Sequence, residues 1–161
     1  MKENRITRAI DVFLDALNEG TLMKGSCEYC AIGNLAQKAI KDSDSFHLDA
    51  TMWSEKYCTN KRGFTFTPTS LPSLSKQQIE YVDELIHLIP FTLEEQIKIE
   101  NIFENSCRIH FKDYNIFTKE EVRADQIKGL EAVVKVMLTF DDHDEGLCDD
   151  IFTKKAELIE I

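Results

Sequence analysis

Two cysteines separated by two residues are the most chemically suggestive feature of the sequence. Cys27 and Cys30 follow a glycine-containing turn and lie at the expected start of a helix. Zinc sites commonly use a Cys-x2-Cys pair with two further thiolate or imidazole ligands, because tetrahedral coordination requires four donors. Downstream, His47 and Cys58 are of the right types, although they lack the tight spacing of a second ligand pair. The sequence therefore suggests a zinc site formed by Cys27, Cys30, His47 and Cys58.

The same cysteine pair has two other interpretations. A helix N-terminus carries partial positive charge and lowers the pKa of a nearby thiol, so Cys27 or Cys30 could be a reactive nucleophile. However, no histidine is marked by its surroundings as a base, and the pair does not follow a strand as a thioredoxin-like motif does. In the third interpretation both cysteines are small buried residues at a close helix crossing. We favour this structural interpretation over zinc, and zinc over thiol catalysis.

Other groups of polar residues give no catalytic signature. Residues 141–146 resemble the start of a calcium loop, but the position that needs a closing carboxylate is Phe152. The acid pairs at 94–95 and 120–121 are explained by their place in the first turn of a helix, where the helix dipole favours acids. Neither of the two common glycine-rich phosphate loops is present. The sequence therefore favours a protein that is not an enzyme.

Length and charge limit the function further. The 161 residues fit one domain, and 43% hydrophobic and 30% charged residues are ordinary for a folded protein. The formal net charge of −10 disfavours direct nucleic-acid binding, which depends on clusters of Lys and Arg, but it allows a basic protein partner. There is no apolar run of about 18 residues and no apolar signal core, so neither a membrane span nor secretion is expected. We expect a cytoplasmic protein.

Apolar residues recur at three- and four-residue intervals and predict an all-α or α-dominated domain of five or six helices. The first helix ends at Gly20, and Ser26 is the expected N-cap of the second, so the two form an N-terminal helical hairpin. Thr92 and Thr118 each precede a glutamate by three residues, as in a capping box. The expected helices are 5–18, 26 to about 40, 73 or 75 to 87, 92–105 and 118–139, with a last amphipathic turn or helix at 151–159.

Between these helices the pattern predicts an interaction segment. A single domain is expected over residues 1–140, with an irregular insert at 42–72, followed by an acidic connector and C-terminal extension at 141–161. Short strands are expected at 64–67 and within 107–117. Trp53, Phe64 and Phe66 in the insert are the predicted anchors for a protein partner, because large aromatic side chains dominate binding energy at interfaces.

Three blocks of sequence support a resemblance: Ala9–Leu22, Lys24–Asn34 and Asp125–Val133. They resemble small uncharacterised proteins of Bacteroidota-type bacteria and their phages. The resemblance covers a minority of the chain and implies a context, an accessory protein of a phage or mobile element, without an activity or cofactor. The leading prediction is thus a non-enzymatic acidic accessory protein that binds a protein partner. The alternatives are a small metal- or ligand-binding domain and, less favoured, a thiol-dependent enzyme.

Overall fold

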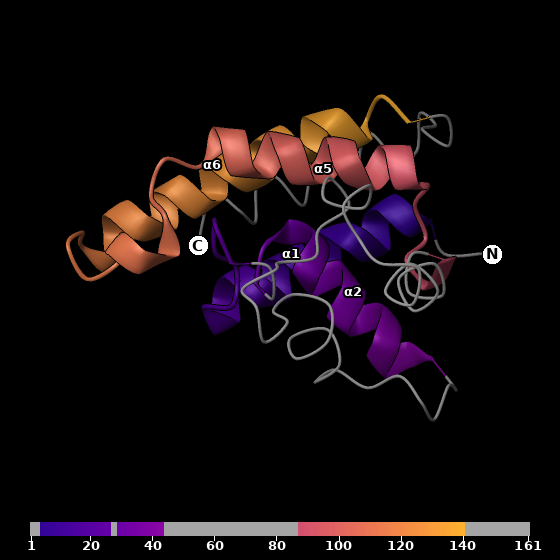
Figure 1. Ribbon diagram of the computed structural model, residues 1–161, viewed down its shortest axis with the longest axis horizontal. Helices are drawn as coiled ribbons and strands as arrows, with labels where there is room; N and C mark the ends of the chain where they lie inside the picture. The colour runs from indigo at the N-terminus through magenta and orange to yellow at the C-terminus, as the bar shows by residue number, and fades with distance from the viewer. Residues whose placement is uncertain (1–3, 27–28, 44–86, 141–161) are drawn as a thin grey trace, which may run out of the picture.

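The computed structural model describes residues 4–26, 29–43 and 87–140 (Figure 1). These residues contain four α-helices and one short 3-10 helix, and no strand occurs among them, which confirms the predicted all-α class. None of the described helices is long and apolar enough to cross a membrane. The elements are α1 (Arg5–Glu19), α2 (Ala31–Asp42), α5 (Leu93–Ser106), η3 (Phe111–Asp113) and α6 (Lys119–Met137).

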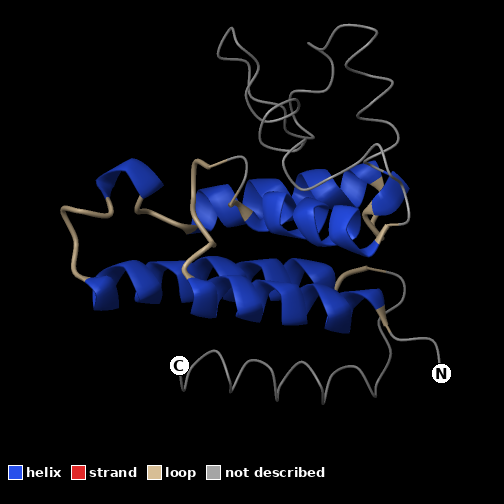
Figure 2. Cartoon of the chain, turned by 90° about the horizontal axis from the view of Figure 1, so that it is seen from below, coloured by secondary structure: helices blue, strands red, loops and turns tan. Residues whose placement is uncertain are grey.

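The four α-helices surround one apolar core. Helices α5 and α6 lie side by side along one edge of the molecule, with α1 and α2 beneath them (Figure 1). Helix α1 also contacts α6 and α2 also contacts α5, so each helix packs against two others, and Figure 2 shows the resulting two layers. The predicted N-terminal helical hairpin, α1 with α2, is confirmed.

Local sequence determines both ends of α1. The Asn4 side chain accepts a hydrogen bond from the Ile6 N–H at 2.8 Å, which satisfies one of the unpaired amides of the first turn. Gly20 ends the helix in the left-handed conformation with φ of 74°, as predicted. The predicted apolar face is buried in full: Ile6, Ala9, Ile10, Phe13, Leu14 and Leu17.

Helix α2 begins later than the sequence predicted. Ser26 is not its N-cap, because the helix starts at Ala31 and Cys30 takes the N-cap position, with its sulphur accepting from the Gly33 N–H at 3.3 Å. Ser26 closes a turn before the helix: its carbonyl accepts from the Cys30 N–H at 2.8 Å and its hydroxyl from the Tyr29 N–H at 3.2 Å. This turn is favourable for serine because its hydroxyl readily forms hydrogen bonds with neighbouring backbone groups outside helices.

Both predicted capping boxes are present. Thr92 and Glu95 exchange side-chain-to-backbone bonds at the start of α5, and Thr118 and Glu121 do the same at the start of α6. Helices α1, α5 and α6 agree with the predicted ranges to within two residues. The capping motif was a reliable signal because it depends only on residues within one turn.

The predicted strand within 107–117 is wrong. The segment contains the short helix η3 instead. The Arg108 and Ile109 amides donate to the Asp125 carboxylate at 2.8 and 2.9 Å, so a side chain of α6 supplies the acceptors that a neighbouring strand would have supplied. The other predicted strand, at 64–67, lies outside the described residues, as do the C-terminal extension and nearly all of the third predicted helix and the insert.

Candidate functional site

The predicted cysteine site is only partly within the described residues. Cys30 is 4% exposed, and its sulphur serves as the N-cap of α2. Cys27, His47 and Cys58 lie outside the described ranges, so the four-ligand zinc site stays a prediction. Across residues 4–26, 29–43 and 87–140, no cluster of three or more His, Cys, Asp or Glu side chains could hold a metal ion.

The predicted aromatic anchors also lie outside the described residues: Trp53, Phe64 and Phe66. Their role in partner binding stays a prediction.

Asn34 explains why the residues before α2 hold their shape. Its side-chain amide donates to the carbonyl oxygens of Thr21, Tyr29 and Cys30, at 2.7, 3.1 and 3.0 Å. The Thr21 and Tyr29 carbonyls belong to irregular backbone between α1 and α2, and the Cys30 carbonyl also accepts from the Asn34 N–H at 3.0 Å. The similarity of this stretch to a reactive site therefore has a structural explanation at Cys30 and Asn34.

Titratable side chains gather where the connection between α1 and α2 meets the connection between α5 and α6. We call this cluster the polar joint. It consists of Lys24, Glu104, Cys107, His110 and Asp125.

Hydrogen bonds to the backbone hold the polar joint together. The Lys24 ammonium donates to the Cys107 carbonyl at 2.6 Å, and the Phe111 N–H donates to the Lys24 carbonyl at 3.0 Å. The Gly25 N–H donates to the Glu104 carboxylate at 3.0 Å. Residues at least 79 positions apart in the sequence are thus bound to each other. The joint fixes the N-terminal hairpin to the α5–α6 pair.

The Cys107 thiol is not suited to nucleophilic chemistry. It is 2% exposed, and its sulphur donates to the Asp125 carbonyl at 3.7 Å. Burial, reinforced by the nearby Asp125 and Glu104 carboxylates, raises the pKa of the Cys107 thiol to about 12. Since the thiolate is the nucleophilic form, almost none is present at neutral pH. Cys107 instead packs against Gly129, where a Cβ atom would collide with the sulphur.

The other titratable groups of the joint are also occupied by the protein itself. Burial raises the pKa of the Glu104 carboxyl, while the Gly25 N–H and the charge of Lys24 act in the opposite direction. His110 Nδ1 accepts from the Lys112 N–H at 3.2 Å, and its ring lies against Gly25, so closely that a Cβ there would collide with it. The polar joint therefore serves as a structural connection between the N-terminal hairpin and the α5–α6 pair.

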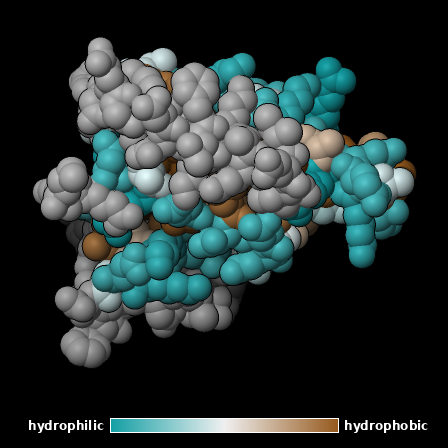
Figure 3. All heavy atoms as spheres, turned by 180° about the vertical axis from the view of Figure 1, so that it is seen from behind, coloured by the Kyte–Doolittle hydropathy of each residue, from teal (hydrophilic) through white to brown (hydrophobic). Residues whose placement is uncertain are grey.

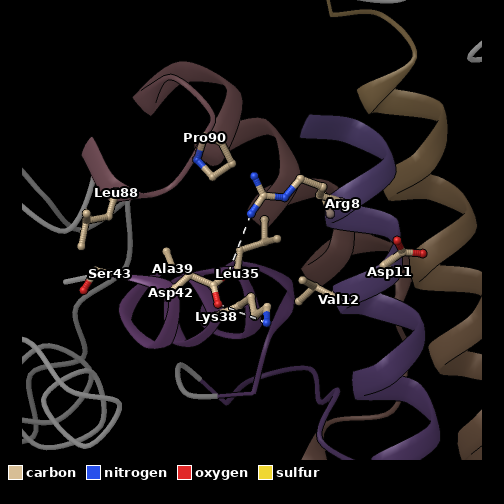
Figure 4. A pocket seen from close by; sticks show the side chains of 11 residues that line it. Arg8, Asp11, Val12, Leu35, Lys38, Ala39, Asp42, Ser43, Leu88 and Pro90 are labelled. Atoms are coloured by element: carbon tan, nitrogen blue, oxygen red, sulfur yellow. Dashed lines mark ion pairs between the residues drawn. The ribbon is translucent and has the colours of Figure 1, made fainter. Parts of the chain in front are cut away.

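A groove between α1 and α2 has a charged rim and an apolar floor (Figure 4). Its volume is about 450 Å³. Arg8 and Lys38 both point to Asp42, at 3.8 and 3.2 Å, so the rim charges pair with one another. Ser43 and Leu88 line this groove, and beyond them the chain continues into residues 44–86, outside the described ranges.

A second groove lies between the end of α1 and the start of α6. We call it the Phe117 groove; its volume is about 510 Å³. Ile116 is 72% exposed and Phe117 is 42% exposed, and these are the exposed large hydrophobic side chains of the described chain. The groove is lined by Leu17, Asn18, Glu19, Gly20, Met23, Tyr114, Phe117, Lys119, Val122, Arg123 and Gln126.

The Phe117 groove lies at the projecting end of the molecule. In Figure 1 the end formed by η3 and the start of α6 extends beyond the other helices, and from behind it shows hydrophobic atoms among hydrophilic ones (Figure 3). Its backbone is held by the Gln126 side chain, which donates to the Leu22 carbonyl at 2.6 Å, and by the Tyr114 hydroxyl, which donates to the same carbonyl at 3.5 Å. The exposed pair is thus presented by an anchored loop.

A partial signal for this surface is present in the sequence. Phe117 precedes the N-cap Thr118, and Val122 occupies the fourth helical position, the two places that a hydrophobic staple joins across a helix start. Both residues line the groove, which is consistent with a staple. A staple does not account for the exposure of Phe117 or for Ile116. Sequence reasoning missed the surface because exposure cannot be read from a two-residue apolar run.

Comparison of the chain with models of known protein families, with curated protein sequences and with solved structures finds no match in any of the three.

Proposed function

We propose that this protein is not an enzyme and acts by binding a protein partner through the Phe117 groove. The carrying observation is the pair of adjacent large apolar side chains, Ile116 and Phe117, exposed beside an open groove. Burying one large apolar side chain contributes roughly 1.5–3 kcal/mol, and aromatic side chains are frequent interface hot spots. Two such side chains on an anchored loop are a suitable centre for an interface.

The polar joint supports a non-catalytic function. Its Lys24 ammonium, Glu104 carboxylate and Asp125 carboxylate bond to backbone groups of the same chain, and its Cys107 thiol is buried. A catalytic residue must reach a substrate, so groups engaged in this way are poorly placed for it. The accessory role in a phage or mobile element, implied by the sequence resemblance, fits a protein that works through an interaction.

Site-specific cross-linking in the producing cell tests this proposal. A photoreactive phenylalanine analogue replaces Ile116 in one variant and the exposed Lys128 of α6 in the control. We expect one partner to cross-link from position 116 and not from position 128. The same partner should co-purify with the unmodified protein, but not with the Ile116→Ser, Phe117→Ser double variant.

Three results would contradict the proposal. One is the absence of a position-specific adduct; another is an adduct with a second copy of this chain alone. The third is a partner that the double serine variant retains. Circular dichroism of the double variant shows beforehand that it folds, so that loss of binding is not confused with loss of structure.

A further inference from the structure

We infer that the Phe117 groove receives a peptide segment of the partner in which a carboxylate lies next to a large apolar residue, with Arg123 as the receptor of the carboxylate. This inference rests on the proposed function. It assigns the chemistry of the bound segment and a specificity-determining residue.

Arg123 has unused hydrogen-bonding capacity in the groove wall. Its Nη2 donates to the Asn18 side-chain oxygen at 3.1 Å, a neutral amide acceptor. Its Nε is shielded from solvent and has no acceptor among the described residues, and no carboxylate of those residues forms an ion pair with this guanidinium. The shielded Nε is out of reach of a ligand, but the Nη end is accessible, since its bond to Asn18 lies at the exposed surface and is the only one that the described residues give this side chain. A carboxylate is the acceptor that guanidinium groups bind most strongly.

The charge around the groove is opposite to that of the whole chain. Lys119 and Arg123 line it together with a single acid, Glu19, whereas the chain carries a net charge of −10. The excess of basic side chains in the lining favours an acidic segment at this groove, which contributes to specificity as well as to affinity. A basic partner, allowed by the overall charge, would not find its complement at this groove.

The apolar part of the groove specifies the second feature of the segment. Met23, Phe117 and Val122 contribute apolar surface to the same groove as Arg123. Because Phe117 is 42% exposed, the groove is open to the surface and fits an extended segment better than an enclosed small molecule. An apolar side chain against Phe117 and a neighbouring carboxylate on Arg123 can be supplied by adjacent residues of one peptide.

Selection of displayed random peptides on the full chain, followed by calorimetry with synthetic peptides, tests the inference. We expect enriched sequences to carry Asp or Glu next to an aromatic or aliphatic residue. Arg123→Gln should weaken their binding about tenfold, in line with one charged hydrogen-bonded pair. The matched control Lys128→Gln removes a charge from an exposed position of the same helix and should change the affinity less than about twofold.

A peptide variant with Asn in place of Asp allows a double-mutant cycle between the peptide carboxylate and Arg123. If the carboxylate binds Arg123, this peptide loses about as much affinity for the wild type as Arg123→Gln causes, and Arg123→Gln then has little further effect on it. Equal effects of Arg123→Gln on both peptides would overturn the inference.

The outcomes separate the inference from the proposed function. If Phe117→Ser abolishes peptide binding while Arg123→Gln does not change it, the inference is wrong and the proposed function stands. If no peptide is enriched, or if Phe117→Ser leaves binding intact, both are contradicted. If 3-phenylpropionate alone binds as tightly as the peptides, the groove is a small-molecule site and the inference is wrong.

Discussion

The two ends of the loop between α5 and α6 differ in what their side chains do. At the first end, Cys107 and His110 belong to the polar joint, where thiol, imidazole and carboxylate groups contact the protein itself. At the second end, Ile116 and Phe117 face solvent. The thiol, imidazole and carboxylate side chains stabilise the fold, and the apolar pair Ile116 and Phe117 is the better candidate for a binding function.

Backbone hydrogen bonding explains this difference. The Arg108 and Ile109 amides have no local acceptor and use the Asp125 carboxylate of α6. Near the second end, the Ile116 N–H donates to the Asp113 carbonyl at 2.9 Å, and the capping box at Thr118 satisfies the start of α6. Local bonds therefore satisfy this part of the backbone without an acceptor from a distant side chain such as Asp125.

The largest effect is expected at Gly25 of the polar joint. Gly25 has φ of 82°, and a Cβ would collide with the His110 ring, so Gly25→Ala combines backbone strain with a steric clash. We expect a loss of about 2–3 kcal/mol in the free energy of unfolding, measured by urea denaturation.

Gly20→Ala is the matched control for the clash. Gly20 has a similar φ of 74°, but no atom lies within 4 Å of its Cβ position, so we expect a loss of only about 1 kcal/mol. In a His110→Ala background the clash is absent, so Gly25→Ala should lower the free energy of unfolding no more than Gly20→Ala does. Equal costs of the two alanine variants in the wild-type background would show that His110 does not constrain the joint.

A smaller effect is expected at Asp125. Asp125→Asn removes the charged acceptor of the Arg108 and Ile109 amides and should lower the free energy of unfolding by about 1–2 kcal/mol. Asp113→Asn, an exposed residue of the same loop, should change it by less than about 0.5 kcal/mol. An equally small loss of stability for Asp125→Asn would show that the first end of the loop does not depend on this side-chain acceptor.

The pH dependence of Glu104 is a further test of the joint. Burial raises the pKa of this carboxyl in the folded state, so its contribution to stability is most favourable below its unfolded pKa and is lost as the pH rises through the folded pKa. Relative to Glu104→Gln, the wild type should therefore gain stability as the pH falls through the acidic range. Denaturation curves of both proteins at a series of pH values measure this.

Glu95→Gln should show the opposite sign. The hydrogen bond from Arg5 lowers the pKa of Glu95, and the two side chains meet at 2.7 and 2.9 Å. Its contribution is present above the unfolded pKa and is lost as the pH falls through the folded pKa. The stability difference between the wild type and Glu95→Gln should then shrink on acidification. The same sign for both variants would contradict the assigned causes.

The smallest effect on stability is expected at Ile116. Because its side chain is 72% exposed, Ile116→Ser should change the free energy of unfolding by less than about 0.5 kcal/mol. The same substitution should nevertheless weaken binding of the partner identified by cross-linking. A large loss of stability would show that Ile116 supports the fold rather than an interface.

Sequence alone was sufficient for the local features. The apolar face of α1 and the capping boxes at Thr92 and Thr118 were predicted correctly, because each depends on residues within a few turns of one helix. The all-α class followed from the same periodicity. The N-cap of α2 was misplaced because the sulphur of Cys30 is a weaker and less common capping group than the hydroxyl of Ser26.

Tertiary structure decided everything that depends on distant residues. The Asp125 carboxylate accepts from the amides of residues 108 and 109, so these residues do not pair with a neighbouring strand as predicted. Lys24 and Gly25 bond to residues at the end of α5 that are at least 79 positions away in the sequence. The exposure of Ile116 and Phe117 and the position of Arg123 beside them likewise depend on where α1 ends relative to α6. Periodicity reports which face of a helix is buried, but it contains no information on which loops meet.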